Sequence, residues 1–498
     1  MARADRMASE SGIPSFDLMV RAGHAVAAAA LRRFPEACRF AVICGPGNNG
    51  GDGYIAARLL VESGASVALF ALGDPDRLKG DAELAFRAWG EEVAPLQDFE
   101  PRAGDIVIDA LFGAGLSRDV PDEVADVIAA VAKAELPVLA IDLPSGLNGR
   151  SGKPLGAAFR AECTITFMAR KPGHLLLPGK SLCGDMAVAD IGIPKRIIEA
   201  VAGALAENRP EIWAATLPTT DSDSHKYRRG HLAIFSGGAS KTGAARLSAL
   251  AGLKTGAGLV TVASPADAMA ANAAHLTAVM LRQIETEADL REWLESAKLS
   301  AFVLGPGFGI GPRARDFVLA LNDKPLVLDA DGITSFRDNP ETLFEAFAVG
   351  DTRLVLTPHE GEFGRLFPDI AANDFLSKPE KASQAAKRAH AVIVYKGADT
   401  VIASPDGRAA INTNGPPWLA TAGSGDVLAG MIGALLAQGM PAFEAAAAGV
   451  YLHGEAARIA GPGMTAEDLA EQAGRALISL QQVRQKSVLP PQFVEAKK

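Results

Sequence analysis

Side chains that carry oxygen ligands follow the apolar runs of the N-terminal half of the chain. They are Asn48, Asn49 and Asp52 in CGPGNNGGDG (44–53), Asp109 in DALFGAG, and Asp142 with Ser145 in DLPSG. If the apolar runs are parallel strands, their carboxyl ends meet at one edge of a sheet. A lone aspartate there usually caps a helix or closes a turn. Oxygen-bearing side chains at several strand ends instead predict a site for a hard cation, because such a cation prefers oxygen ligands.

The glycines of the same segment allow a second interpretation. Gly45, Gly47 and Gly50 have the spacing G-x-G-x-x-G, and Asp74 follows Gly53 by roughly 20 residues, as in dinucleotide-binding folds where an acid holds the ribose. Against this, the segment is longer than the fingerprint requires, and no catalytic histidine or Tyr–Lys arrangement follows it. A loop that only cradles a pyrophosphate also does not need asparagines. An oxidoreductase is nevertheless one open alternative from spacing alone.

In the C-terminal half, an acid stands beside a glycine-rich helix start. TAGSGD (421–426) precedes the small-residue segment VLAGMIGALLAQG (427–439). Gly423, Gly425 and the first N–H groups of such a helix form an anion site. Asp426 is either a first-turn acid that complements the helix dipole, or the base that takes a hydroxyl proton during phosphoryl transfer. The adjacent anion site favours phosphoryl transfer.

Three further segments support this assignment with less specificity. YKGADT (395–400) offers a lysine and backbone donors to a nucleotide phosphate, GPGFG (305–309) permits close approach of the backbone to a ligand, and TPHEGEF (357–363) ends an apolar run with His359 and two acids. Each also has a purely structural interpretation, as a turn or a buried histidine. Their common position after apolar runs favours a binding site.

Apolar runs alternate with Ala/Leu-rich helical stretches in both halves, which predicts two α/β domains with parallel sheets. The strand-like runs are 40–44, 66–72, 105–112, 137–144 and 162–169, then 231–238, 258–265, 301–309, 325–332, 354–363 and 391–404. A surface helix is predicted from Ile197 to Trp213, and the polar stretch 217–230 indicates a linker. We expect domains at 1–213 and 225–485, with the linker assigned to 214–224.

The bulk composition excludes several classes of protein. The 498 residues are 48% hydrophobic and 21% charged, and the net charge is −9. An acidic chain lacks the basic field that nucleic acids or membrane surfaces attract. The N-terminus has no apolar signal segment, and no apolar run approaches the ~18 residues of a membrane span. The four cysteines show neither zinc nor disulfide spacing. We expect a cytoplasmic protein.

The N-terminal motifs carry a resemblance. MARADRMASESGIPSFDLMVRAG, GPGNNGGDGYIAARLL, DALFGAGL, IDLPSGLN and DIGIP together resemble the YjeF N-terminal domain, the NAD(P)H-hydrate epimerase family, over essentially residues 1–200. The resemblance implies a Rossmann-like three-layer sandwich that binds a hydrated nicotinamide nucleotide and K⁺. The implied substrate contacts are Asn48, Asn49, Gly50, Gly51, Asp52, Gly113, Ala114, Gly115, Leu116, Ser117, Arg118, Asp119 and Asp142, and the implied K⁺ ligands are Asn49, Asp109 and Ser145.

The C-terminal motifs carry a second resemblance. HKYRRGHLAIFSGG, KTGAARLSALAGLKTGAGLVTV, GPGFG, LDADG, TPHEGEF, KGADT and AGSGDVLAG resemble the ADP-dependent NAD(P)H-hydrate dehydratase domain, which has a ribokinase-like fold, over about residues 220–480. By motif, Ala244, Gly307, His359 and Asp426 would contact the hydrated nucleotide. Lys396, Gly397, Ala398, Asp399, Thr400 and Gly425 would contact the adenine nucleotide. ADP as co-substrate, with Mg²⁺, is therefore expected.

Together the two resemblances imply repair of hydrated NADH and NADPH. The first domain would interconvert the R and S epimers, with Asp142 as the group that shuttles a proton to and from the ring hydroxyl. The second would dehydrate the S epimer, with Asp426 as base. A homo-oligomer is expected. Two alternatives stay open: a vitamin-type kinase for hydroxymethylpyrimidine or thiazole alcohols, and a non-catalytic binding role for the first domain.

Overall fold

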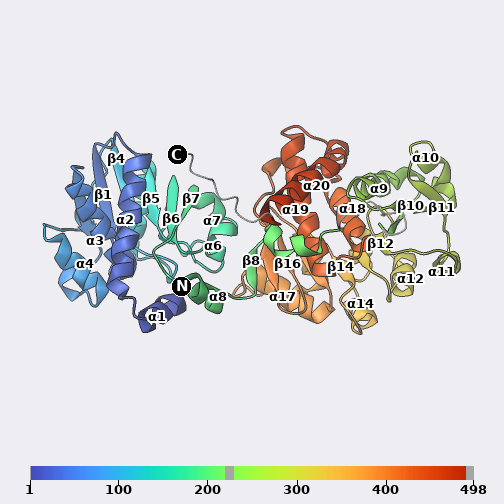
Figure 1. Cartoon of the computed structure of the whole chain (residues 1–498), viewed down its shortest axis with the longest axis horizontal. Helices are drawn as coiled ribbons and strands as arrows, with labels where there is room; N and C mark the ends of the chain where they lie inside the picture. Colours follow the sequence, from blue (N-terminus) through green and yellow to red (C-terminus); the bar gives the residue numbers. More distant parts are fainter. Residues whose placement is uncertain (1, 219–228, 489–498) are drawn as a thin grey trace, which may run out of the picture. The chain divides into compact units, whose positions relative to one another are not determined.

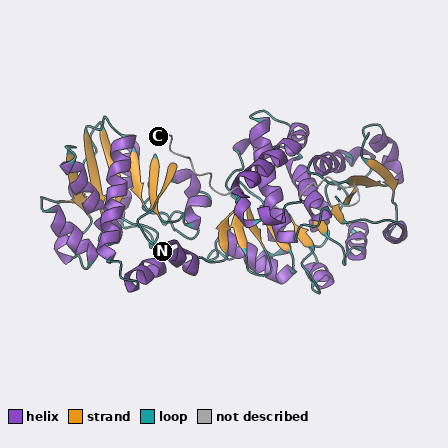
Figure 2. Ribbon diagram, viewed as in Figure 1, coloured by secondary structure: helices purple, strands orange, loops and turns teal. Residues whose placement is uncertain are grey.

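Two β-sheets, one in each part of the chain, organise the computed structural model, which describes residues 2–218 and 229–488 (Figure 1). Residues divide into two units, Met1–Gly203 and Ala204–Lys498. Helices flank the strands in each unit (Figure 2). The predicted α/β class with two domains built on parallel sheets is confirmed. No helix of the described residues is long and apolar enough to span a membrane.

The sheet of the first unit has the strand order β3-β2-β1-β4-β5-β6-β7, and every neighbouring pair is parallel. Its strands are β1 Arg39–Cys44, β2 Val67–Ala71, β3 Ala94–Pro95, β4 Asp105–Ala110, β5 Val138–Ile141, β6 Cys163–Phe167 and β7 Asp185–Ala189. Its helices are α1 Ala2–Glu10, α2 Ser15–Arg33, α3 Asn48–Glu62, α4 Asp81–Trp89, α5 Asp122–Lys133, α6 Pro172–Leu175, α7 Gly179–Leu182 and α8 Lys195–Val201, with 3₁₀ turns η1 Pro75–Arg77 and η2 Leu96–Asp98.

Alternate residues of β1 enter two separate cores. Val42 packs with α2, α3 and α4, whereas Ala41 and Ile43 pack with α5 on the opposite face. The period of two along a strand produces this alternation. In α5, Val124, Val127, Ile128 and Val131 recur at helical spacing and are buried. The result is a three-layer sandwich in which the loops after β1, β4 and β5 leave the same edge of the sheet.

The second sheet has the order β11-β10-β9-β12-β13-β14-β15-β16-β17-β8, parallel except for the pairs β15–β16 and β16–β17. Its strands are β8 Leu205–Glu207, β9 His231–Phe235, β10 Leu259–Ser264, β11 Met280–Gln283, β12 Ala301–Leu304, β13 Leu326–Leu328, β14 Leu354–Leu356, β15 Val392–Tyr395, β16 Val401–Ala403 and β17 Ala409–Ile411. The helices are α9 Gly243–Lys254, α10 Met269–Ala273, α11 Glu287–Ser296, α12 Pro312–Ala320, α13 Ala330–Thr334, α14 Pro340–Phe347, α15 Glu360–Leu366, α16 Pro368–Ala371, α17 Lys378–Ala389, α18 Ser424–Ala437, α19 Ala442–Ala460 and α20 Ala466–Val488, with 3₁₀ turns η3 Pro210–Ile212, η4 Ala214–Thr216, η5 Ala239–Lys241, η6 Ala266–Ala268 and η7 Pro417–Leu419.

The central helix of the second unit, α18, is buried along its length because its small residues let neighbours approach closely. Residues from Val427 to Ala437 are buried. A Cβ on Gly430 would lie 2.1 Å from the carbonyl oxygen of Ser248 in α9. The hydroxyl of Ser248 in turn donates to the carbonyl of Asp426, at 2.7 Å. Contact with α9 therefore fixes the position of the α18 N-terminus.

The region between the two units differs from the prediction. The helix expected from Ile197 to Trp213 is wrong, because α8 ends at Val201 and β8 then pairs with β17. The first unit accordingly ends at Gly203, before the predicted limit at 213. Of the predicted linker 214–224, residues 214–216 form η4, and Leu217 is buried in the core of the second unit. The part from 219 to 224 lies outside the described residues.

Candidate active sites

The segment NNGGDG, predicted as a loop, forms the first turns of α3, with Gly47 as N-cap. Gly45, just before this segment, and Gly50, within it, must be glycines because other backbone atoms lie close to their Cα atoms. A Cβ on Gly45 would lie 1.9 Å from the carbonyl oxygen of Leu111, and one on Gly50 would lie 2.0 Å from that of Gly45. These approaches hold the β1–α3 turn against the segment after β4. The asparagines and Asp52 thereby project from the start of a helix.

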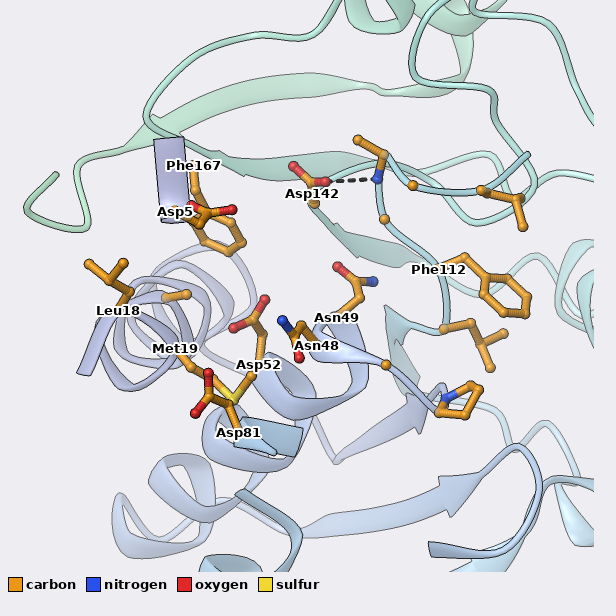
Figure 3. A pocket seen from close by; sticks show the side chains of 18 of the residues that line it. Asp5, Leu18, Met19, Asn48, Asn49, Asp52, Asp81, Phe112, Asp142 and Phe167 are labelled. Carbon is orange, nitrogen blue, oxygen red and sulfur yellow. Dashed lines mark hydrogen bonds between the residues drawn. The ribbon is translucent and has the colours of Figure 1, made fainter. Parts of the chain in front are cut away.

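A pocket of about 710 Å³ opens at this edge of the first sheet (Figure 3). It lies between α1 and α2, the start of α3, the segment 111–118 and the end of β5. Figure 3 shows Asn48, Asn49, Asp52 and Asp142 around one space. The structure thus brings most of the predicted substrate residues together. Gly50, Gly51 and Asp119 are not among its lining residues: Gly50 and Gly51 are buried in α3, and Asp119 follows the lining segment.

Asp142 is held by a dense set of donors. It has φ +65°, a strained conformation for an aspartate. Its Oδ2 accepts from the Ala114 N–H at 2.9 Å, and its Oδ1 accepts from Thr166 Oγ1 at 2.9 Å and from Lys171 Nζ at 2.5 Å. Burial alone would raise the pKa of Asp142, but Lys171 and the other donors hold it below its usual value. The carboxyl group is therefore ionised at neutral pH.

The pKa of Asp52 is shifted in the opposite direction. Burial, followed by repulsion from Asp142 and Asp5, raises the pKa of Asp52 well above its usual value. Two carboxyl groups of one pocket thus have pKa values shifted in opposite directions, the arrangement that separates general acid from general base. Sequence analysis did not identify Lys171. Its signal was its position just beyond the strand-like run 162–169, at the same sheet edge.

Asp109 and Ser145, the other two predicted cation ligands, are joined beneath the pocket. Ser145 donates to Asp109 from its N–H at 2.6 Å and from its hydroxyl at 2.5 Å, and the hydroxyl accepts from the Phe112 N–H at 2.8 Å. Burial raises the pKa of Asp109 to about 6, although these bonds and one from Leu111 oppose it. Asp109 thus carries most of a buried negative charge at neutral pH, which a cation would offset.

The amide of Asn49 fits the same cation site. Its Nδ2 is buried with no hydrogen-bond partner. A Cβ on Gly113 would lie 3.0 Å from Asn49 Oδ1 and 2.9 Å from Asp142 Oδ2. The segment 112–114 therefore touches Ser145, Asn49 and Asp142 in turn. The Nδ2 donor cannot bind a cation, so the Oδ1 atom of Asn49, with the oxygens of Asp109 and Ser145, would supply the ligands for a monovalent cation.

In the second unit, a group of charged side chains gathers where β13, β14 and β15 end and α18 begins. Asp329 Oδ1 accepts from Lys396 Nζ at 2.7 Å. A Cβ on Gly425 would lie 3.5 Å from Lys396 Nζ and 3.7 Å from Asp329 Oδ2. Burial and repulsion from Asp329 raise the pKa of Asp426 to about 6, against the attraction of Lys396. The predicted residues Gly425, Asp426 and Lys396 are thus brought together, and sequence analysis missed Asp329.

The remaining predicted residues of this unit line neighbouring segments. Gly307 has φ +65°, and a Cβ on it would lie 3.7 Å from that of Ala244. Ala244 is partly exposed, whereas its neighbour Ala245 is in the core. His359 caps α15 by accepting from the Gly361 N–H at 3.0 Å. The Lys396 N–H donates to the Pro358 carbonyl at 2.9 Å, so the segments that contain His359 and Lys396 are adjacent.

In the turn after β15, the backbone at 397–398 is exposed, whereas the side chain of Asp399 is buried. The Gly397 N–H donates to Thr400 Oγ1 at 3.1 Å, and Asp399 is buried in an ion pair with Lys378 at 2.5 Å. Gly397 and Ala398 are exposed. The carboxylate of Asp399 therefore stabilises the turn, and the exposed backbone at 397–398 faces solvent.

Comparison with known proteins finds a family match in each half of the chain. Residues 15–173 match the YjeF-related protein N-terminus family, and residues 232–478 match the NAD(P)H-hydrate dehydratase family. The chain is 38% identical to the bifunctional NAD(P)H-hydrate repair enzyme Nnr of Moorella thermoacetica, over 95% of this chain and 94% of that one. The corresponding Escherichia coli enzyme is 33% identical, over 94% and 90%.

Among solved structures, an ADP/ATP-dependent NAD(P)H-hydrate dehydratase from Bacillus subtilis is similar to this chain, with 26% identity and a TM-score of 0.47 over 56% of this chain and 100% of that one. The matches to the two families fall in different units of the fold, and the curated relatives span both. The chain belongs to the family of bifunctional NAD(P)H-hydrate repair enzymes.

Proposed function

We propose that the first unit interconverts the epimers of hydrated NADH and NADPH, and that the second dehydrates the S epimer with ADP. The observation that supports the epimerase site is the pair of carboxyl groups in one pocket, Asp52 with a raised pKa and Asp142 with a lowered one. The relatives named above are called bifunctional NAD(P)H-hydrate repair enzymes. The pocket volume, about 710 Å³, lies within the range usual for small-molecule sites.

Epimerisation needs little more than controlled proton transfer. The hydroxyl on carbon 6 is adjacent to the ring nitrogen, whose lone pair helps to expel it and leaves a planar centre. Asp52 donates a proton to the departing hydroxyl, and water then adds to either face while Asp142 accepts its proton. Transfer of that proton from Asp142 back to Asp52 restores the starting state. The Ala114 N–H and Lys171 orient Asp142 throughout.

Asn49, Asp109 and Ser145 would hold K⁺ beneath this pocket. When bound, the ion supplies positive charge that offsets the buried carboxylate of Asp109 and stabilises the segment after β4. The segment 112–114 connects that site to Asp142. Loss of the ion is therefore expected to weaken substrate binding by loosening this segment, and to leave the acid–base pair itself in place.

For dehydration, Asp426 takes the proton of the ring hydroxyl as that oxygen attacks the terminal phosphorus of ADP. The bond from that phosphorus to the bridging oxygen breaks, and AMP leaves. The Gly425 N–H at the start of α18 and the ammonium of Lys396 stabilise the transferring charge. The phosphate ester is a better leaving group than hydroxide, and elimination then regenerates the reduced nucleotide. A pKa of about 6 for Asp426 keeps this base mostly ionised, yet still basic, near neutral pH. ADP would be bound with Mg²⁺.

A mixture of R and S hydrates tests both activities. Without adenine nucleotide, the R/S ratio should relax to equilibrium with no gain of NADH absorbance. With ADP and Mg²⁺, both epimers should be consumed and NADH absorbance should return. Accumulation of a phosphorylated alcohol in place of NADH would favour the vitamin-kinase alternative, which leaves the first unit without a role. Decay of the S epimer alone would contradict the epimerase assignment.

A further inference from the structure

A second pocket lies beside the first on the same unit and has no part in the chemistry above. Its volume is about 380 Å³, and it is lined by the segment 72–74 after β2, by Arg77 and Leu78, and by Pro121 and Glu123 at the start of α5. Pro46, in the turn between β1 and α3, lines both pockets. The two pockets are therefore neighbours across the glycine-rich turn.

The strand order of the first sheet indicates that this pair of pockets suits a dinucleotide. The order β3-β2-β1-β4-β5-β6 is the order of dinucleotide-binding folds, in which the ligand crosses the carboxyl ends of the strands at the switch between β1 and β4. The first pocket reaches Asp142 at the end of β5, and the second begins at the end of β2. Three strand spacings separate these ends, about 14 Å. A dinucleotide bound with its reacting ring beside Asp142 extends toward β2 in such folds.

The chemistry of the second pocket suits a ribose. Asp74 lies three residues after the end of β2, near where dinucleotide-binding folds place the acid that accepts from ribose hydroxyls. Its Oδ1 accepts from the Asp76 N–H at 3.0 Å, and its Oδ2 lies 3.4 Å from Arg77 Nε. About half of the Asp74 side chain is exposed (52%). Among the described lining residues, Asp74 and Glu123 are acids and Arg77 is a cation, a balance that disfavours a phosphate on the ribose.

We propose that this second pocket binds the adenosine half of the hydrated dinucleotide, with Asp74 on the ribose, and that hydrated NADH is therefore preferred over hydrated NADPH. This rests on the epimerase function proposed above. The G-x-G-x-x-G spacing and Asp74, on which the oxidoreductase alternative rested, thereby have a role in binding without hydride transfer. Carboxylate hydrogen bonds to a ribose are lost when Asp74 is removed, and the 2′-phosphate is repelled while Asp74 is present.

The test is the KM for epimerisation of three R hydrates: hydrated NADH, hydrated NADPH, and the hydrated mononucleotide that lacks the adenylate half. In the natural sequence, both of the latter should show a KM about tenfold above that of hydrated NADH. Asp74→Ala should raise the KM for hydrated NADH about tenfold and leave that for the mononucleotide unchanged. Asp74→Asn, which keeps an acceptor for the Asp76 N–H, should reduce the preference for NADH over NADPH.

Glu62→Gln is the matched control, because Glu62 is similarly exposed (55%) and ion-paired at 3.1 Å to Arg58, but lies at the opposite end of α3 from the substrate residues. It should change none of the three KM values. Equal KM values for the mononucleotide and hydrated NADH would overturn the subsite, as would an equal rise for all three substrates in Asp74→Asn. Inactivity of the natural sequence toward all three would instead contradict the epimerase function, and the subsite with it.

Discussion

At the scale of single residues, charge environment divides the roles of chemically identical side chains. Asp142 and Asp52 line one pocket, yet the pKa of Asp142 is lowered below its ordinary value and that of Asp52 is raised above it. The cause of the difference is Lys171, which lies 2.5 Å from Asp142. Lys171, which was not among the predicted site residues, thus lowers the pKa of Asp142 against the effect of burial.

Substitution of Lys171 tests this division. In Lys171→Met the pKa of Asp142 should rise by about 1–3 units, because burial is no longer opposed by the ammonium group. Since epimerisation requires ionised Asp142, its rate falls as pH falls through that pKa, and the acid limb of the pH–rate profile should move to higher pH. Lys171→Arg should keep the limb near its natural position. An unchanged profile in Lys171→Met would contradict the role of the ion pair.

The proposed shuttle is tested more directly by Asp142→Ala. Interconversion of the epimers should slow to the uncatalysed rate, while the S epimer is still dehydrated with ADP, because Asp426 is in the other unit. Asp109→Asn should give a milder defect that depends on K⁺ concentration, because the substrate residues remain. A time course of R-epimer decay at several K⁺ concentrations measures both. Full-speed epimerisation by Asp142→Ala would reduce that residue to a turn acid.

Asp426 has a cost to stability as well as a role in dehydration. Its folded-state pKa of about 6 is above the ordinary 3.8, so its ionisation is harder in the folded protein. The cost is absent below about pH 4 and complete above about pH 6. Asp426→Asn should abolish dehydration, leave epimerisation intact, and raise the unfolding free energy of the second unit at pH 7 by about 1–3 kcal/mol.

Denaturant unfolding followed by tryptophan fluorescence measures this change, because Trp213, Trp293 and Trp418 all belong to the second unit. The stabilisation should largely disappear by about pH 3, below the ordinary pKa of 3.8, where Asp426 is mostly protonated in both states. Dehydration of the S epimer at the natural rate by Asp426→Asn would remove the residue from the mechanism, whatever the stability result.

At the scale of elements, the predictable parts are those with an uninterrupted physical signal. The interior strands β1, β4, β9 and β12 are continuous apolar runs, because both of their faces are covered by helices. The edge strands β7 and β11 were not predicted, since exposure of one side leaves sequences such as DMAVA and MLRQ without such a run. NNGGDG was predicted as a loop because glycine disfavours helices. In the structure it begins a helix, and close backbone contacts require glycine at Gly50.

The candidate sites, like the fold, were predictable only in part. Acids and amides at strand ends could be located, because the carboxyl ends of parallel strands share an edge. Lys171 and Asp329 could not be assigned a partner from sequence, because their importance comes from ion pairs with residues distant in the chain. The helix predicted from Ile197 to Trp213 was wrong beyond Val201, because an apolar and Ala-rich stretch fits a helix and an edge strand equally well.

Close packing of α18 on α9 gives a prediction at this scale. In Gly430→Ala the new methyl would meet the Ser248 carbonyl at 2.1 Å, so α18 must shift, with a loss of about 1–3 kcal/mol of unfolding free energy. The shift should also lower the rate of dehydration, because Ser248 holds Asp426. Gly474→Ala in α20 is the matched control, since its nearest neighbour would be at 3.5 Å, and it should be neutral or stabilising by up to about 1 kcal/mol.

At the scale of the whole molecule, the residues just after Gly203 belong to the second unit. Buried Asn208 donates to Asn412 Oδ1 at 2.9 Å and to the Ala447 carbonyl at 2.8 Å, and it accepts from Trp213 Nε1 at 3.1 Å. A fragment 204–498 should therefore dehydrate the S epimer with ADP. A fragment 225–498, which starts at the limit predicted from sequence, should unfold at a lower temperature. Equal melting temperatures would contradict this assignment of β8.

The pairing of β8 with β17 has a consequence for the order in which the protein is made. The ribosome releases Leu205–Glu207 soon after the first unit is complete, but its partner strand Ala409–Ile411 emerges only after most of the second unit has been translated. The first unit can therefore fold during synthesis. Trp213 and Leu217, by contrast, must wait for α18 and α19 before they are covered. Completion of the second sheet is in this way coupled to near-complete translation of the chain.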